Sequence, residues 1–227
     1  PKKKDFTDYN LGYFRCLAAM DDNVGRLMAE LDKLGLAENT VVVFAGDNGF
    51  YLQEHTLGDK RIAYEEGMRI PMLLRYPKMV EKGKLVDEMV LNIDMAPTFL
   101  ELAGIEVPKT MQGRSWKPLL EGKATDWRKE FYYEYFPEDG FKQPHTRAIR
   151  TEEAKLIKYP GHDDWTEMFD LKNDPYETKN LINDPAYAEL RQKLEVEFNK
   201  QAEAAGCDLS APLPKHDPSK EARERAL

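Results

Sequence analysis

The 227-residue sequence has little cysteine, no excess of positive charge and no long apolar run. Its two cysteines, Cys16 and Cys207, lie far apart in the sequence and predict no disulfide framework. A formal net charge of −8 argues against nucleic acid as a partner. No apolar run approaches the length of a membrane span, so we expect no membrane-spanning segment. The hydrophobic fraction of 41% fits a globular chain with one or two packed domains.

The most informative segment is an apolar run that ends in Asp47-Asn48-Gly49. The run Val41-Val42-Val43-Phe44 is typical of a strand that is buried on both faces, as in parallel sheets. Ligands of open α/β sheets collect at the carboxyl ends of such strands. Asp47 and Asn48 would offer a carboxylate and an amide oxygen to a hard cation such as Ca²⁺ or Mg²⁺. Taken alone, however, the tripeptide favours an ordinary Asx turn.

Several further motifs follow in a fixed order. They are Glu54-His55, Lys60, Arg69-Ile70-Pro71, Asp94-Met95-Ala96-Pro97-Thr98, Gln112-Gly113-Arg114-Ser115 and Asp174-Pro175-Tyr176-Glu177 with Asn180-Leu181. Together with Asp47-Asn48-Gly49 they resemble the sulfatase family of the alkaline phosphatase superfamily, whose members carry such motifs in this order. Each motif is weak alone, but the shared order across most of the chain is a strong signal.

The resemblance implies roles for particular residues. Asp47 and Asn48 would be metal ligands, and Lys60 would contact the sulfate group, although a lone lysine is usually a surface residue. His55 would donate a proton to the leaving oxygen or would only shape its loop. His145 and Arg147 are candidates for holding a carboxylated or sulfated sugar, although isolated polar residues at strand ends are usually just solvated. Their partner would be a sulfated small molecule or carbohydrate.

The sequence lacks a match to the family's nucleophile segment, Cys-x-Pro/Ser-x-Arg, in which the Cys or Ser becomes formylglycine. Neither Cys16 nor Cys207 has the required neighbours, and we interpret Cys16 as a small core residue. The family's paired N-terminal aspartates have no counterpart before Asp47, and the first residues do not predict a signal peptide. We therefore expect the C-terminal part of a sulfatase, inactive alone, whose partner is its missing N-terminal half. Relatives suggest a periplasmic, secreted or lysosome-like compartment.

Periodicity and turn residues predict the secondary structure. Helices are expected over 9–34, with Gly35 as its C-terminal cap, over 94–104 and over 187–205; strands are expected at 40–45, 70–74, 86–92, 131–133, 147–150, 155–159 and 167–170. The fold class is α/β. We expect the C-terminal part of a mixed-sheet alkaline-phosphatase-like domain over 1–125, a small antiparallel sheet packed with a C-terminal helix over 126–206, and a tail over 207–227.

Three functions remain open at this point. The first is a sulfatase fragment acting on sulfated carbohydrate, and the second is a phosphonate monoester or phosphodiester hydrolase of the same superfamily. A formylglycine segment would favour the first, as the motif at 174–181 already does. The third is a noncatalytic interaction module, which a stably folded isolated chain would favour. We expect instead that the isolated chain exposes sheet edges and aggregates.

Overall fold

The computed structural model describes residues 6–58, 60–124, 126–137 and 143–211. The chain forms two compact units, one containing residues 1–47, 71–87 and 91–125 and the other containing 48–70, 88–90 and 126–227. The domain boundaries expected from the sequence stay a prediction, and residues 212–227 of the expected tail lie outside the described residues. Among the described residues, no helix combines the length and the apolar composition that crossing a membrane requires.

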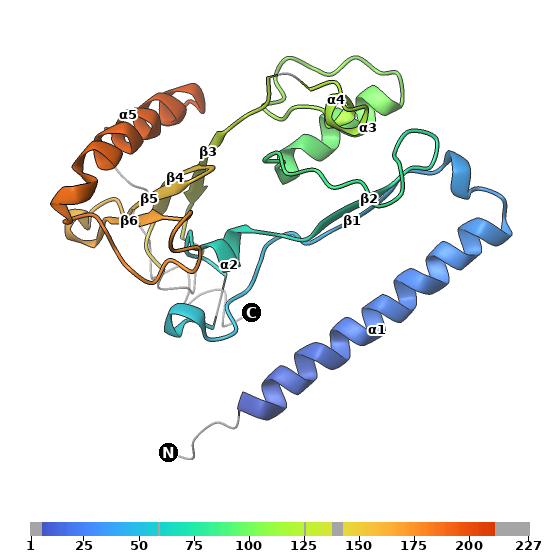
Figure 1. Ribbon diagram of the computed structural model, residues 1–227, viewed down its shortest axis with the longest axis horizontal. Coiled ribbons are helices and arrows are strands. Elements are labelled where there is room, and N and C mark those ends of the chain that lie inside the picture. The colour runs from blue at the N-terminus through green and yellow to red at the C-terminus, as the bar shows by residue number, and fades with distance from the viewer. Residues whose placement is uncertain (1–5, 59, 125, 138–142, 212–227) are drawn as a thin grey trace, which may run out of the picture. The chain divides into compact units, whose positions relative to one another are not determined.

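The first unit begins with the long helix α1 (Phe6–Lys33), as predicted (Figure 1). Gly35 ends it at φ +69°, where its amide donates to Asp32 O and the next amide donates to Leu31 O. The apolar stripe of α1 is largely exposed, with Phe14 60% accessible. Cys16 is exposed too, so its interpretation as a core residue was wrong. Helical periodicity identifies an apolar face but not whether a neighbour covers it.

The strand β1 (Val42–Ala45) pairs with β2 (Met72–Arg75) in a two-stranded sheet (Figure 1). The pairing is antiparallel, with Val42 opposite Arg75, and all four residues of β1 are only partly buried. The prediction of a doubly buried strand in a parallel sheet was therefore wrong. Residues 86–92, all of them described, form no strand and lead into the 3₁₀ turn η3 (Asn92–Asp94), so that predicted strand was also wrong.

A buried aspartate joins α3 (Met95–Leu102) to the chain before α4 (Lys117–Leu120). Asp94 Oδ2 accepts from the Leu91 amide at 2.8 Å, and its Oδ1 accepts from the Arg114 amide at 2.7 Å. The Thr98 hydroxyl donates to Asp94 O and accepts from the Trp116 amide, at 2.6 and 2.8 Å. Asp94 thus stands at the predicted N-terminal position of the helix, but its carboxylate caps neighbouring segments.

The second unit is built on a four-stranded antiparallel sheet, as predicted. Its strands follow chain order, β3 (Glu130–Tyr135), β4 (Thr146–Thr151), β5 (Ala154–Lys158) and β6 (Glu167–Asp170). The C-terminal helix α5 (Ala188–Ala204) lies along one face of this sheet (Figure 1). Short elements complete the chain: η1 (Ala37–Asn39), η2 (Glu54–Thr56), α2 (Glu65–Met68), η4 (Asp163–Trp165) and η5 (Pro185–Tyr187).

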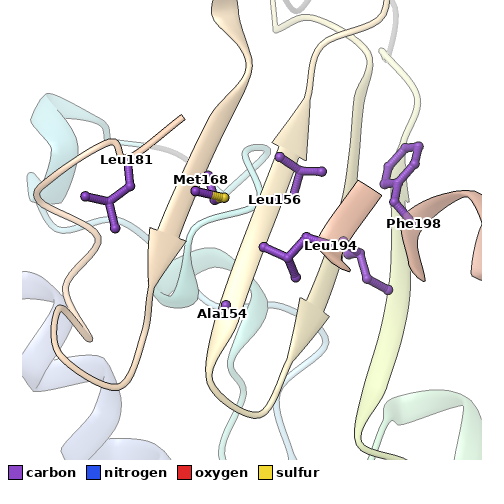
Figure 2. Packing of buried hydrophobic residues seen from close by; sticks show 7 residues of the cluster. Ala154, Leu156, Met168, Leu181, Leu194 and Phe198 are labelled. Carbon is purple, nitrogen blue, oxygen red and sulfur yellow. The ribbon is translucent and has the colours of Figure 1, made fainter. Parts of the chain in front are cut away.

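Both faces of this sheet are covered by apolar side chains. Figure 2 shows the α5 face, where Leu194 and Phe198 of the helix form one cluster with Leu156 and Met168 of the sheet. The other face carries Ala148, Ile157 and Phe169, and residues 62–64 and Met68 pack against them. Side chains along a strand alternate between faces, so each strand serves both clusters. The sheet is consequently the platform on which the segment 48–70 is held.

We predict that Phe198→Ala lowers the free energy of unfolding by about 3–5 kcal/mol, because the ring is 2% exposed and its loss leaves a cavity. Urea denaturation followed by circular dichroism measures the change. Val196→Ala, on the exposed side of the same helix, is the matched control and should stay within about 0.5 kcal/mol. Equal losses for the two variants would contradict the packing of α5 on the sheet.

Candidate functional site

The segment 48–70 brings two of the predicted site residues together. Lys60 Nζ donates to Asn48 Oδ1 at 2.9 Å, and both side chains are partly buried. Asp47, the exposed residue before Asn48, follows the end of β1 after Gly46. An ammonium group and an amide oxygen therefore meet at the position where the sequence predicts an anion and a cation to bind.

The donors at this position match the preferences of a hard cation. The carboxylate of Asp47 and Oδ1 of Asn48 are oxygen ligands, the type that Ca²⁺ and Mg²⁺ select. Ca²⁺ takes about six to eight oxygens, so these two residues would supply only part of its coordination. The chemistry of the pair thus fits the predicted metal, with the remaining ligands coming from elsewhere.

His55 lies in the same segment but is engaged by its neighbours. Its ring stacks on the Tyr64 ring with a centroid separation of 4.0 Å, and its Nε2 lies 3.2 Å from Glu66 Oε2. The backbone of His55 has φ +51°, which non-glycine residues adopt only where the surroundings hold them. These contacts fit the loop-shaping alternative, and a role in proton transfer stays a prediction.

A second group of potential metal ligands was not predicted from the sequence. Among the described residues, His55, Glu66 and Glu177 offer ligand atoms that all lie within 4.8 Å of one another, so they could hold a metal ion. Glu177 already forms an ion pair with Lys155 at 2.7 Å and accepts from the Glu65 amide at 2.7 Å. A cation bound by Glu177 would therefore share its carboxylate with the Lys155 ammonium group.

The charged groups beneath the segment form a buried cluster. Lys155 Nζ, which is fully buried, lies 2.8 Å from Glu65 Oε1 and 2.7 Å from Glu177 Oε1. Arg150 Nη2 pairs with the other oxygen of Glu65 at 3.1 Å. Sequence reasoning missed this cluster because a lysine is almost never fully buried unless it is paired. The one available signal was its position inside the apolar run Ala154-Lys155-Leu156-Ile157.

Burial and these cations act in opposite directions on the two carboxyl groups. Burial raises the pKa of Glu65, but the attraction of Lys155 and the hydrogen bonds from Arg150 outweigh it and leave the pKa below its usual value. Burial dominates at Glu177, where it holds the pKa above the usual value in spite of Lys155. The cluster therefore depends on the electrostatic complementarity of residues from distant parts of the chain.

Two glycines let the segment fold back on itself. The Gly49 amide donates to Gly67 O at 2.9 Å, and a Cβ on Gly49 would lie 1.8 Å from Glu66 O. A Cβ on Gly67 would lie 2.4 Å from the hydroxyl oxygen of Tyr51, which is fully buried and donates to Ile62 O. The residue after Asn48 is thus held directly against α2.

The two predicted sugar-binding residues belong to the second unit, near the start of β4. The His145 ring meets the edge of Phe136 at a centroid distance of 5.9 Å. Arg147 Nε donates to Glu134 Oε1 at 3.1 Å and lines a cavity of about 580 Å³ with Lys158 and Arg191. Since Ala148 faces the segment 48–70, its neighbour Arg147 projects from the opposite face of the sheet. Their role in binding substrate stays a prediction.

Comparison with known proteins gives consistent matches. A family model for the C-terminal region of N-sulphoglucosamine sulphohydrolase matches residues 53–204. The chain is 41% identical over 194 residues to the N-acetylglucosamine-6-O-sulfatase of Bacteroides thetaiotaomicron, which covers 83% of this chain and 35% of that protein. It is 34% identical over 192 residues to a multifunctional alkaline phosphatase superfamily protein of Trinickia caryophylli, covering 78% of this chain and 37% of that protein.

A solved structure is similar as well. It is described as a complex with its substrate D-glucosamine-2-N,6-O-disulfate, and it matches with a TM-score of 0.79 and 39% identity. The match covers 82% of this chain and 39% of that one. The chain thus spans between 35% and 39% of the length of the proteins in these matches.

We predict that Gly49→Ala lowers the free energy of unfolding by about 1–3 kcal/mol, because the added Cβ meets backbone atoms that cannot move aside. Gly58→Ala in the same segment is the control. Its Cβ would have only an ordinary contact, 3.5 Å from Gln53 Nε2, so its effect should stay within about 0.5 kcal/mol. Thermal and urea unfolding measure the stability of the two variants. Equal stabilities would contradict the close approach of Gly49 to α2.

Proposed function

Because the chain belongs to the sulfatase family, as part of the family of N-sulphoglucosamine sulphohydrolase C-terminal regions, we propose that it forms the C-terminal portion of a metal-dependent sulfuric ester hydrolase. The observation that carries this proposal is the contact between Lys60 Nζ and Asn48 Oδ1 at 2.9 Å, directly after Asp47. The nucleophile would reside in the N-terminal part of the same protein, which would be the partner of this chain. The chain alone would be inactive.

The proposed chemistry follows from how charge moves in the reaction. Attack at the sulfur of a sulfate ester builds negative charge on the leaving oxygen, and fixed positive groups lower that barrier. The Lys60 ammonium would bind a sulfate oxygen, while its contact with Asn48 orients it. Asp47 and Asn48 would hold Ca²⁺ or Mg²⁺, which when bound acts as a Lewis acid on the ester.

The proposed substrates are sulfated carbohydrates. The relative from Bacteroides thetaiotaomicron is named for an N-acetylglucosamine 6-O-sulfate, and the similar solved structure holds a disulfated glucosamine. His145 and Arg147 remain the candidates for binding the sugar. We further propose a periplasmic, secreted or lysosome-like location, on the family resemblance alone.

A second function is favoured by one observation. The relative from Trinickia caryophylli is described as a multifunctional member of the alkaline phosphatase superfamily. A phosphonate monoester or phosphodiester presents the same anionic oxygens to Lys60 and to a cation at Asp47. Comparing kcat/KM for a chromogenic aryl sulfate and for the matching phenyl phosphonate, with the complete enzyme, separates the two functions.

We predict that Lys60→Ala and Asp47→Ala each lower kcat for an aryl sulfate by about a hundredfold or more in the complete enzyme, because each removes a group that stabilises developing charge. Asp47→Ala should also reduce the bound calcium or magnesium measured by elemental analysis, whereas Lys60→Ala should retain it.

Asp21→Ala is the control for these variants, because Asp21 is an exposed acidic residue on α1. It should change neither turnover nor metal content. Wild-type turnover in Lys60→Ala, or unchanged metal content in Asp47→Ala, would overturn the role assigned to that residue.

A further inference from the structure

We propose that Glu177 and Lys155 are positioning residues, which hold the segment 48–70 so that Asn48 and Lys60 keep their places. The proposal rests on the function proposed above for Lys60. Neither residue touches Lys60 or Asn48 in the described contacts. Each acts through α2, which lies between the buried cluster and the segment's first residues.

Lys155 and Glu177 form an ion pair inside the protein. Lys155 and the Glu177 side chain have no solvent exposure, and a buried charge is tolerated only when it is paired. Lys155 belongs to β5, and Glu177 lies in the loop between β6 and α5. Their ion pair at 2.7 Å therefore fixes the motif at 174–181 on the sheet.

The helix α2 is attached to this ion pair through Glu65. Glu177 Oε2 accepts from the Glu65 amide at 2.7 Å, which satisfies a donor that the first turn of a helix leaves open. Lys155 pairs with the Glu65 carboxylate at 2.8 Å. A helix of four residues is not stable by itself, so α2 depends on these external contacts.

Gly49 links the position of α2 to the position of Asn48. The Gly49 amide donates to Gly67 O, and Gly49 approaches Glu66 O so closely that no side chain would fit. Gly49 is bonded to Asn48, whose Oδ1 accepts from Lys60. A shift of α2 therefore displaces the amide oxygen that orients the ammonium group.

The backbone of Glu177 is consistent with this role. Its φ of +52° lies in the left-handed region, where a residue with a Cβ is disfavoured. Such a conformation persists when the surroundings over-determine it. Here the ion pair with Lys155 and the contact with the Glu65 amide both require the carboxylate at one place.

The test is a mutant cycle in the complete enzyme, with an aryl sulfate as substrate. Glu177→Gln keeps the shape of the side chain but removes its charge, and we expect kcat to fall by about ten- to a hundredfold while KM changes less, as for a small misplacement of catalytic groups. In a Lys60→Ala background the same substitution should lower kcat by a clearly smaller factor, because the misplaced ammonium group is already absent and only the displacement of Asn48 remains.

Glu153→Gln is the matched control. Glu153 pairs with Lys172 at 3.0 Å on the exposed surface of the same unit, so the substitution removes one paired charge without reaching α2. We expect unchanged kcat and KM. If Glu177→Gln reduces the yield of folded enzyme, Glu65→Gln provides the second variant, since the Glu65 side chain is partly exposed and contacts the same lysine.

A readout independent of activity is amide hydrogen exchange, measured by mass spectrometry. Glu177→Gln should speed exchange about tenfold or more in peptides covering 48–70, and by a clearly smaller factor in peptides of β4 and β5. Equal acceleration throughout the second unit, or none in 48–70, would overturn the proposal, as would a loss of kcat that persists in full in Lys60→Ala.

These outcomes separate the proposal from the function on which it rests. If Lys60→Ala leaves turnover intact, the role of Lys60 fails, whereas the exchange experiment still decides whether Glu177 holds the segment. If Lys60→Ala is inactive but Glu177→Gln is as fast as wild type, the positioning role alone fails.

Discussion

The second unit depends on a lysine that has no contact with solvent. An ammonium group in the interior of a protein loses its hydration, and removing a partner from such a pair costs about 3–5 kcal/mol. Lys155 therefore relies on both of its ion-pair partners, Glu65 and Glu177. These partners come from the segment 48–70 and from the loop after β6. The ion pairs thus tie three parts of the chain, far apart in sequence, to one arrangement, and the segment that carries Asn48 and Lys60 is among them.

The motifs that carry the family resemblance divide into two kinds. Those at 94–98 and 174–181 hold the fold, because Asp94 caps the amides of Leu91 and Arg114, and Asn180 Oδ1 accepts from the amides of Met168 and Ile182. The glycine of the 112–115 motif belongs with them, since a Cβ on Gly113 would lie 2.0 Å from Ile93 O. The residues that we predict to bind the metal and the sulfate group belong to the motifs within 47–60. Motifs of the first kind are recognisable in sequence for structural reasons, so the motif pattern alone does not locate a reactive centre.

The apolar periodicity of the sequence predicted those helices and strands that are determined by their own residues. The helices α1 and α5 and the four strands of the antiparallel sheet appear where apolar spacing and turn residues place them. The direction of β1's partner and the absence of a strand at 86–92 depend on distant segments, and both were predicted wrongly. At the site, the motifs predicted separate roles for Asn48 and Lys60, and the contact between their side chains is seen only in the structure. The Lys155 cluster could not be found in this way, because a buried lysine differs from a surface lysine only through partners that are remote in sequence. The sequence also does not show on which face of the sheet Arg147 lies. That face is known only because the structure shows which face Ala148 occupies.

A net charge of −8 is at first sight unfavourable for a protein whose proposed substrate is an anion. The effect of a charge on a bound anion depends on the distance between them and on the partners of that charge. Salt largely screens the interaction of exposed charges that are more than about 10 Å apart. The acidic residues nearest in sequence to Lys60 on α2 are engaged, Glu65 by Lys155 and Arg150, and Glu66 by the imidazole of His55. Lys60, by contrast, has a neutral amide as its described partner. The buried cluster therefore has two consequences, since it holds the segment 48–70 and also pairs the Glu65 carboxylate of α2 with two cations.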